Sequence, residues 1–278
     1  MTQIENSKPS VSLPPPAGSD PVANMSFFEH VDELRVRLMR CLWVFMGGFA
    51  GFYLIAEKLL GFLRKPLFEV MPPAMRHLYF TNLFETFLVH LKFAGYASLI
   101  FLSPYFFYQL WGFIAPGLKE RERKMVIPFV TTASGFFIGG ALFAYYFLFP
   151  VAFKYFVTYG GPFDAPMLTI DAYYSTCLKL LLLFGLAFEL PVFIVLLGAI
   201  GVVDAPTLRQ HRRTAILVIS VIAALFAPPD AVSMLVLAGP LVILFEGAIW
   251  VVQGLGAKRN VKASEPAPET TLVGRSKP

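Results

Sequence analysis

Long stretches without a single charged residue run through most of this chain of 278 residues. Such a segment of about 20 residues crosses the bilayer core as a helix, because every backbone N–H and C=O must there be satisfied within the segment. The pattern predicts an all-α integral membrane protein with six transmembrane helices. The uncharged stretches cover residues 41–56, 93–118, 125–153, 180–203 (interrupted only by Glu189), 214–229 and 231–245.

Composition supports a membrane protein over a soluble one. Only 15% of the residues are charged and 56% are hydrophobic, whereas soluble domains average about 25% charged. The last two stretches are short and are joined through Pro228, Pro229 and Asp230. Because proline cannot continue a helix, we expect two short spans here and a locally thinned bilayer.

The distribution of basic residues predicts the orientation. Of the 23 Lys and Arg residues, 16 lie in the two tails and in the loops around 119–124 and 204–213. By the positive-inside rule, both termini and these loops face the cytoplasm and the segment 57–92 faces outward. The expected location is a cytoplasmic (inner) membrane, crossed several times.

Three parts are expected along the chain. Residues 1–25 and 258–278 are polar and Pro-containing and are predicted to be disordered cytoplasmic tails. Residues 26–257 form the membrane domain, which begins with an amphipathic helix at 26–38. The spans are expected at about 38–56, 93–118, 125–153, 180–203, 214–229 and 231–252.

Several classes of enzyme and binding site are excluded because the sequence lacks the residues that they need. There is no Gly-rich phosphate loop with a lysine, and Cys and His are too sparse for a convincing metal site. All four histidines fall outside the uncharged stretches, so no span supplies a base to activate a serine. We expect no enzyme activity, no catalytic residue, no cofactor and no nucleic-acid partner.

Glu189 is the least expected residue of the sequence, since it stands in the apolar run FGLAFELPVF. A charged side chain at the bilayer centre costs about 2.5 to 3.5 kcal/mol on insertion scales, so Glu189 is expected to face protein or a water-filled hollow. Pro191 removes an N–H and loosens the helix there. In the second span, Gln109 is expected to satisfy carbonyls freed by Pro104 and Pro116 and to form, together with Glu189, an intramembrane polar site. The alternative for Glu189 is a hydrogen bond that only holds two helices together.

Acidic residues at the basic cytoplasmic face form a second candidate site. Glu33 lies on the polar face of the amphipathic helix, and Glu122 lies in the loop KERERK. A carboxylate is the preferred acceptor for a guanidinium fork, and Phe113 is placed to pack the apolar part of such a partner. The alternatives are weak surface ion pairs for the acids and a membrane-interface anchor for the aromatic ring.

Six motifs, in this order, carry a resemblance to a known family. They are ELRVRL (33–38), YQLWGFIAPGL (108–118), ERERK (120–124) followed by VIP, FAYYFLFPVAF (143–153), FGLAFELPV (184–192) and LFAPPD (225–230). Together they resemble the TatC family, the multispanning receptor subunit of the twin-arginine protein translocase, over roughly residues 26–252. TNLFETFLVHLK (81–92) departs from the family pattern, because it lacks the Pro-Thr that often precedes the glutamate.

The resemblance implies a membrane scaffold shaped like a cupped hand that exports folded proteins, driven by the proton-motive force. Its implied partners are twin-arginine signal peptides, small single-span subunits of the TatA and TatB types, membrane lipid and further copies of itself. The implied signal-peptide residues are Glu33, Arg35, Phe113 and Glu122. The implied intramembrane carboxylate is Glu189, and the implied outer-loop sites are Pro66 and Asp230.

A different class of function stays open on the sequence alone. An intramembrane carboxylate beside a broken helix also suits a small proton-coupled secondary transporter that uses Glu189. Against this, the sequence contains no duplicated halves and no second interrupted span with a matching charge. A passive scaffold that binds no signal peptide is a third possibility.

Overall fold

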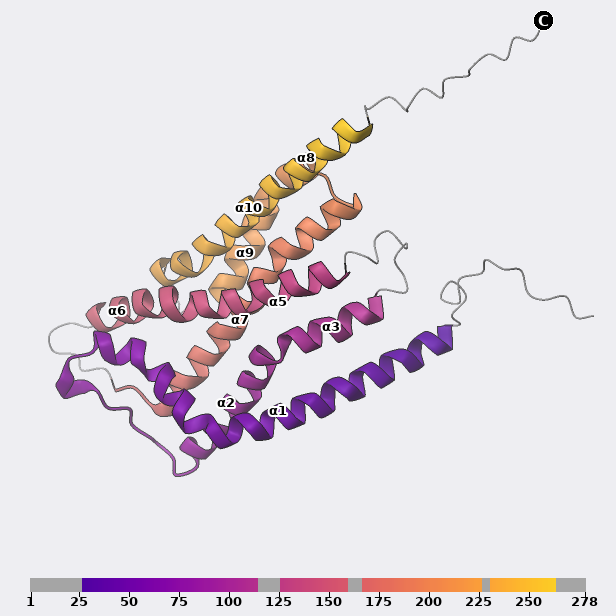
Figure 1. The fold of residues 1–278 in the computed structure, drawn as a ribbon. Coiled ribbons are helices and arrows are strands. Elements are labelled where there is room, and N and C mark those ends of the chain that lie inside the picture. Colours follow the sequence, from indigo (N-terminus) through magenta and orange to yellow (C-terminus); the bar gives the residue numbers. More distant parts are fainter. Residues whose placement is uncertain (1–26, 115–125, 160–166, 227–230, 264–278) are drawn as a thin grey trace, which may run out of the picture.

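The computed structural model describes residues 27–114, 126–159, 167–226 and 231–263, and these parts are almost wholly helical (Figure 1). A single β-bridge, between Tyr79 and Thr169, is the extended pairing found in them. The all-α membrane architecture is therefore confirmed. The elements are α1 (Phe27–Val70), the 3-10 turn η1 (Pro73–Met75), α2 (Glu85–Phe101), α3 (Ser103–Ile114), α5 (Val126–Phe143), the π-helical turn η3 (Ala144–Leu148), α6 (Phe149–Tyr159), α7 (Ile170–Ile200), α8 (Ala205–Gln210), α9 (Arg212–Phe226) and α10 (Ala231–Ala263).

Four helical segments are long and apolar enough to cross a membrane: within α1, through α5 to α6, in α7 and within α10. The pair α2 and α3 qualifies as a fifth span when it is counted as one element bent by 56°. At 15 residues, α9 is about 22 Å long, which agrees with the short fifth span expected from the sequence. The arrangement is consistent with six spans, one of them bent and one short.

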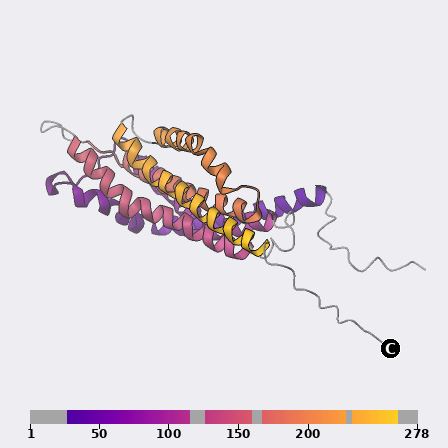
Figure 2. The ribbon, with the colours of Figure 1, turned by 90° about the horizontal axis from the view of Figure 1, so that it is seen from above.

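The bounds of α1 differ most from the expected spans. Its 44 residues form one helix that includes residues 27–38 of the expected amphipathic segment and continues past Lys58 and Lys65. At 1.5 Å per residue it is about 66 Å long, so it extends beyond the bilayer core of about 30 Å. Seen from above, the beginning of α1 and the end of α10 reach the same end of the bundle (Figure 2). We call this the Glu33 end, and the opposite end, where α1 finishes, the Pro66 end.

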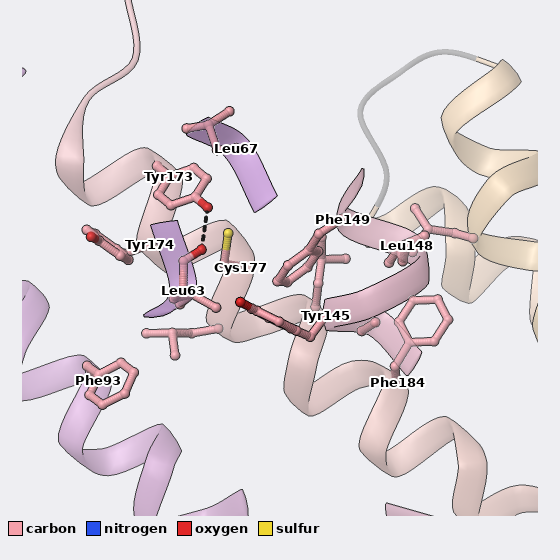
Figure 3. Close-up of a cluster of buried hydrophobic side chains, with 14 of the residues drawn as sticks. Leu63, Leu67, Phe93, Tyr145, Leu148, Phe149, Tyr173, Tyr174, Cys177 and Phe184 are labelled. Atoms are coloured by element: carbon pink, nitrogen blue, oxygen red, sulfur yellow. Dashed lines mark hydrogen bonds between the residues drawn. The ribbon is translucent and has the colours of Figure 1, made fainter. Parts of the chain in front are cut away.

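The main hydrophobic core joins the last third of α1 to α2, η3, α6 and α7. Three tyrosine hydroxyls within it donate hydrogen bonds to backbone carbonyls of α1, and one of these bonds is drawn in Figure 3. The donors and acceptors are Tyr145 with Phe62 (2.9 Å), Tyr173 with Leu63 (2.8 Å) and Tyr174 with Leu60 (3.2 Å). Polar contacts therefore anchor α1 inside an otherwise apolar cluster.

Small residues let α5 and α7 approach closely. A Cβ at Gly140 would collide with the carbonyl oxygen of Phe184, so the two backbones touch at this point. Phe137 lies one turn before Gly140 on α5, and a Cβ added to Gly185 of α7 would lie 3.1 Å from its ring. In membranes such close packing is a principal source of helix association.

Candidate functional site

A chain of hydrogen bonds joins the beginning of α1 to the end of α3. The guanidinium of Arg37 donates from Nε and Nη2 to Oε1 of Glu33, at 2.9 and 2.5 Å. Its Nη1 donates to Oε1 of Gln109 at 3.3 Å, and Nε2 of Gln109 donates to the hydroxyl of Tyr105 at 2.8 Å. Two donors of Arg37 thus hold Glu33 on α1 and the third holds Gln109 on α3, which fixes the guanidinium between the two helices.

Two further contacts shape this site. The rings of His30 and Phe113 stack with centroids 4.2 Å apart and an interplanar angle of 11°. Gly112 lies so close to the guanidinium of Arg37 that a Cβ at this position would collide with Nη1. The helices α1 and α3 are therefore joined by the stack of His30 on Phe113 and by the packing of Arg37 against the backbone of Gly112.

The carboxylate of Glu33 retains one oxygen that no hydrogen bond satisfies. Oε1 accepts both bonds from Arg37, whereas Oε2 is buried and accepts none from the described residues. Nδ1 of His30 lies 3.7 Å from Oε2, and 20% of the Glu33 side chain is exposed. A buried acceptor without a donor costs about 1 to 3 kcal/mol, so this oxygen is ready to accept a hydrogen bond from a ligand.

The other expected residues lie in three places. Arg35 is exposed on α1 and has no ion pair among the described residues. Pro66 is buried near the far end of the same helix. Glu122 and Asp230 lie outside the described residues. Of the expected signal-peptide residues, Glu33 and Phe113 are linked through His30, which lies near the carboxylate and stacks on the ring.

Glu189 lies deep in the bundle and is only 3% exposed. On α7 it stands midway between Gly185, which faces Phe137, and Phe193, whose ring centroid is 6.1 Å from that of Phe129. It consequently faces α5 in the middle of the packed interface. Both of its carboxylate oxygens are buried without a hydrogen-bond partner, so the interhelical hydrogen bond considered from the sequence is absent from this part of the structure.

Two neighbouring elements contribute further unsatisfied polar atoms near this depth. Oγ of Ser134 on α5 and Nε1 of Trp111 on α3 are buried and have no hydrogen-bond partner among residues 27–114, 126–159, 167–226 and 231–263. The Trp111 ring packs on Phe129 at 4.3 Å and on Phe193 at 6.4 Å between centroids. Gln109, expected to share the intramembrane polar site, instead bonds with Arg37 and Tyr105.

Sequence reasoning missed Arg37, His30 and Tyr105. The signal for Arg37 was present, because a residue four positions after a glutamate lies on the same helix face and pairs with it. His30 lies three positions before Glu33 and shares that face as well. The contact with Gln109, 72 residues away, carried no such local signal. Among the described residues, no three His, Cys, Asp or Glu side chains group in a way that could hold a metal ion.

A family model described as Sec-independent protein translocase protein (TatC) matches residues 29–240. The chain belongs to the TatC family. It is 36% identical to the protein of that name from Campylobacter jejuni over 237 residues, covering 85% of this chain and 97% of the relative. It is 38% identical to the Magnetococcus marinus protein over 232 residues, covering 83% and 85%.

Solved structures agree with this assignment to the TatC family. A crystal structure described as the twin arginine translocase receptor TatC superposes with a TM-score of 0.72 at 31% identity, covering 82% of this chain and 100% of the other. A second, in the detergent DDM, gives 0.73 at 32% identity. The family is named as a protein translocase, so the comparisons favour the translocase hypothesis over a proton-coupled transporter. A translocase subunit of this family is not an enzyme.

Proposed function

We propose that this chain is the signal-peptide receptor and core subunit of a twin-arginine translocase, which exports folded proteins using the proton-motive force. Its family and the names of its relatives support this function. The structural observation that carries it is the free Oε2 of Glu33, next to a carboxylate oxygen already held by Arg37.

Recognition of a paired arginine follows from this geometry. Arg37 holds the carboxylate in place and leaves Oε2 as the acceptor for an incoming guanidinium, which binds carboxylates through a planar fork. A lysine ammonium lacks this fork and is more strongly hydrated. The stack of His30 and Phe113 lies beside the same carboxylate and supplies an apolar surface for the residues next to the pair. Glu122 is assigned to the second arginine.

The finer roles of the chain follow the same hypothesis. The protein lies in the cytoplasmic membrane with both termini and the Glu33 end in the cytoplasm, as the distribution of basic residues predicts. Glu189 receives a polar group from a single-span partner of the TatA or TatB type or from an inserted signal peptide. Arg35 contacts the peptide or lipid, Pro66 and Asp230 serve the outer face, and copies of the protein associate with one another.

Photocrosslinking tests the recognition step. A signal peptide with a benzophenone beside its paired arginines is added to membranes that contain the protein, and the crosslinked position is mapped by digestion. Crosslinks close to Phe113 are expected, and they disappear when both arginines are replaced by lysines. Equal crosslinking of both peptides contradicts the proposed receptor.

A matched pair of variants tests the residue that carries the proposal. Glu33→Gln removes the charge from the acceptor and should lower crosslinking at least about tenfold, because hydrogen bonds to a charged group contribute about 1.5 to 3 kcal/mol. Asp32→Asn removes the same charge from the exposed neighbouring position and should leave crosslinking unchanged. Equal losses in both variants would indicate a general effect of negative charge.

A further inference from the structure

One face of α1 near the Pro66 end lines an open cavity of about 300 Å³. Gly61, Arg64, Lys65 and Phe68 lie along it at spacings of three and four residues, so they form one continuous strip of the helix surface. Glu69 and Arg76 complete the lining. Around Gly61 there is open space, since a Cβ added there would meet no atom within 4 Å.

Arg76 reaches this cavity because the chain turns back after α1. The 3-10 turn η1 (Pro73–Met75) follows the helix, and Nε of Arg76 donates to the carbonyl oxygen of Met71 at 3.1 Å. This bond holds the guanidinium at the rim, and neither Nη group has a hydrogen-bond partner among the described residues. Arg64 lies close enough to the Tyr174 hydroxyl to interact with it electrostatically.

The charges around the cavity are unbalanced. Three cations and one carboxylate line it, a net charge of +2. Among the described residues, none of these cations has a carboxylate oxygen within 4.0 Å; Lys65 instead lies 5.4 Å from the centroid of the Phe62 ring. Gathered like charges destabilise a fold through mutual repulsion, and a bound anion would remove that cost.

We propose that this cavity is a binding site for a phosphate group. Two arginine forks and a lysine ammonium match the oxygens of a phosphate, which arginine binds in bidentate fashion. The site lies near the end of a membrane-spanning helix, and Phe68 gives its wall an apolar portion. The head group of an anionic phospholipid is the source that this position favours, and free inorganic phosphate is the other source of the same chemistry. Neither depends on the proposed receptor function.

Thermal unfolding of the purified full-length protein in detergent tests this site. A ligand present at about 100 times its Kd should raise the unfolding midpoint by roughly 5 °C or more. Phosphatidylglycerol, phosphatidylcholine and inorganic phosphate are added separately. Phosphatidylcholine carries the same phosphate but also a cationic choline group. Because the cavity has a net positive charge, this group should be repelled and the shift in the unfolding midpoint should be smaller.

Two double variants separate this site from general attraction of anions. Arg64→Gln/Arg76→Gln removes two cations that line the cavity and should lose most of the shift with phosphatidylglycerol. Lys92→Gln/Lys154→Gln removes the same charge from the same end of the molecule, outside the cavity, and should keep the shift. Each variant is compared with itself in the absence of ligand, so a change in its own stability does not affect the result.

The outcomes are distinct. A shift with phosphatidylglycerol but not with inorganic phosphate assigns the site to a lipid head group, and a shift with both assigns it to the phosphate group alone. Equal shifts in the two double variants, or no shift in the unmodified protein with any of the three ligands, overturn the proposal.

Discussion

The hydroxyl of Tyr145 donates a 2.9 Å hydrogen bond to the carbonyl oxygen of Phe62. In an α-helix this carbonyl would accept from the N–H four residues later, which is the position of Pro66 and has no N–H. The tyrosine therefore replaces a helical bond that the proline removes. The rings of Phe62 and Tyr145 also stack, with centroids 4.5 Å apart.

The break between α2 and α3 repeats this arrangement on a smaller scale. Pro104 removes the helical donor for the carbonyl of Ile100, and Oγ of Ser103 donates to that carbonyl at 2.8 Å. Ser103 is buried, where an unsatisfied carbonyl would be costly. In both helices a side-chain hydroxyl compensates for a proline, as membrane-buried backbone requires.

The first prediction concerns Tyr145. Tyr145→Phe should destabilise the protein by about 1 to 3 kcal/mol, because the Phe62 carbonyl then lacks any donor. In a Pro66→Ala background the restored N–H bonds that carbonyl, so the same substitution should cost much less. Thermal or denaturant unfolding in detergent measures this coupling as a double-mutant cycle.

Tyr146→Phe is the control for this cycle. Tyr146 is the next residue on the same π-helical turn, is 66% exposed and should tolerate the loss of its hydroxyl. If Tyr145→Phe costs the same with and without Pro66, the hydroxyl does not compensate for the proline.

Much of the architecture was predictable because it depends on local composition. The apolar stretches, the basic loops and the short span at α9 each follow from residues adjacent in sequence. The continuation of α1 through Lys58 and Lys65 was not predictable in this way. Its stability comes from tyrosines more than 80 residues away, which bond to its carbonyls.

The candidate site was likewise predictable only in those parts that depend on local sequence. Glu33 and Phe113 could be identified from their residue types at the cytoplasmic face and from the family resemblance. The partner of Gln109 could not be predicted, because an amide in an apolar span is equally consistent with a contact to Glu189. Its actual partner, Arg37, depends on how α1 packs on α3, and single-sequence patterns do not record this packing.

The second prediction concerns the contact between α5 and α7. Gly140→Ala should destabilise the protein by about 1 to 3 kcal/mol, the typical cost of overpacking, because the new Cβ would overlap the backbone of Phe184. Gly139→Ala should be neutral or slightly stabilising, since its Cβ would meet nothing within 4 Å and alanine favours the helix. Unfolding in detergent compares the pair, and equal effects would contradict close backbone packing at Gly140.

The third prediction concerns the support beneath Glu33. Gly112→Ala places a methyl group where Nη1 of Arg37 lies, and should displace the guanidinium from Gln109 and loosen the carboxylate. We expect weaker crosslinking of a twin-arginine peptide, with a loss similar to that in Arg37→Gln. Gly47→Ala, on α1 with open space around it, is the control. Unchanged crosslinking in Gly112→Ala would show that Arg37 does not position Glu33.

The fourth prediction concerns Glu85, a buried glutamate with a complete set of partners. Its Oε2 accepts from N and Oγ1 of Thr81, at 2.7 and 2.9 Å, and from N of Asn82 at 3.3 Å, while Oε1 accepts from N of Asp171 at 2.7 Å. The carboxylate thereby ties the segment before α2 to the beginning of α7. Glu85→Leu should lower the free energy of unfolding clearly, since several bonds to a charged group are lost together. A smaller loss than in Asn82→Ala would contradict this role.

The last prediction is the opposite result for Glu189, which is also buried but has no hydrogen-bond partner in the part of the chain that the structure describes. Glu189→Leu should raise the stability of the isolated protein by about 1 to 3 kcal/mol, because two unsatisfied oxygens leave an apolar interface. If Glu189 binds a polar group during export, the same variant should lose transport of a twin-arginine substrate in cells, while Glu189→Gln retains part of it. Greater stability together with lower transport would mark a residue that is kept for function at the expense of the fold. A less stable Glu189→Leu would instead show that the carboxylate holds α5 and α7 together.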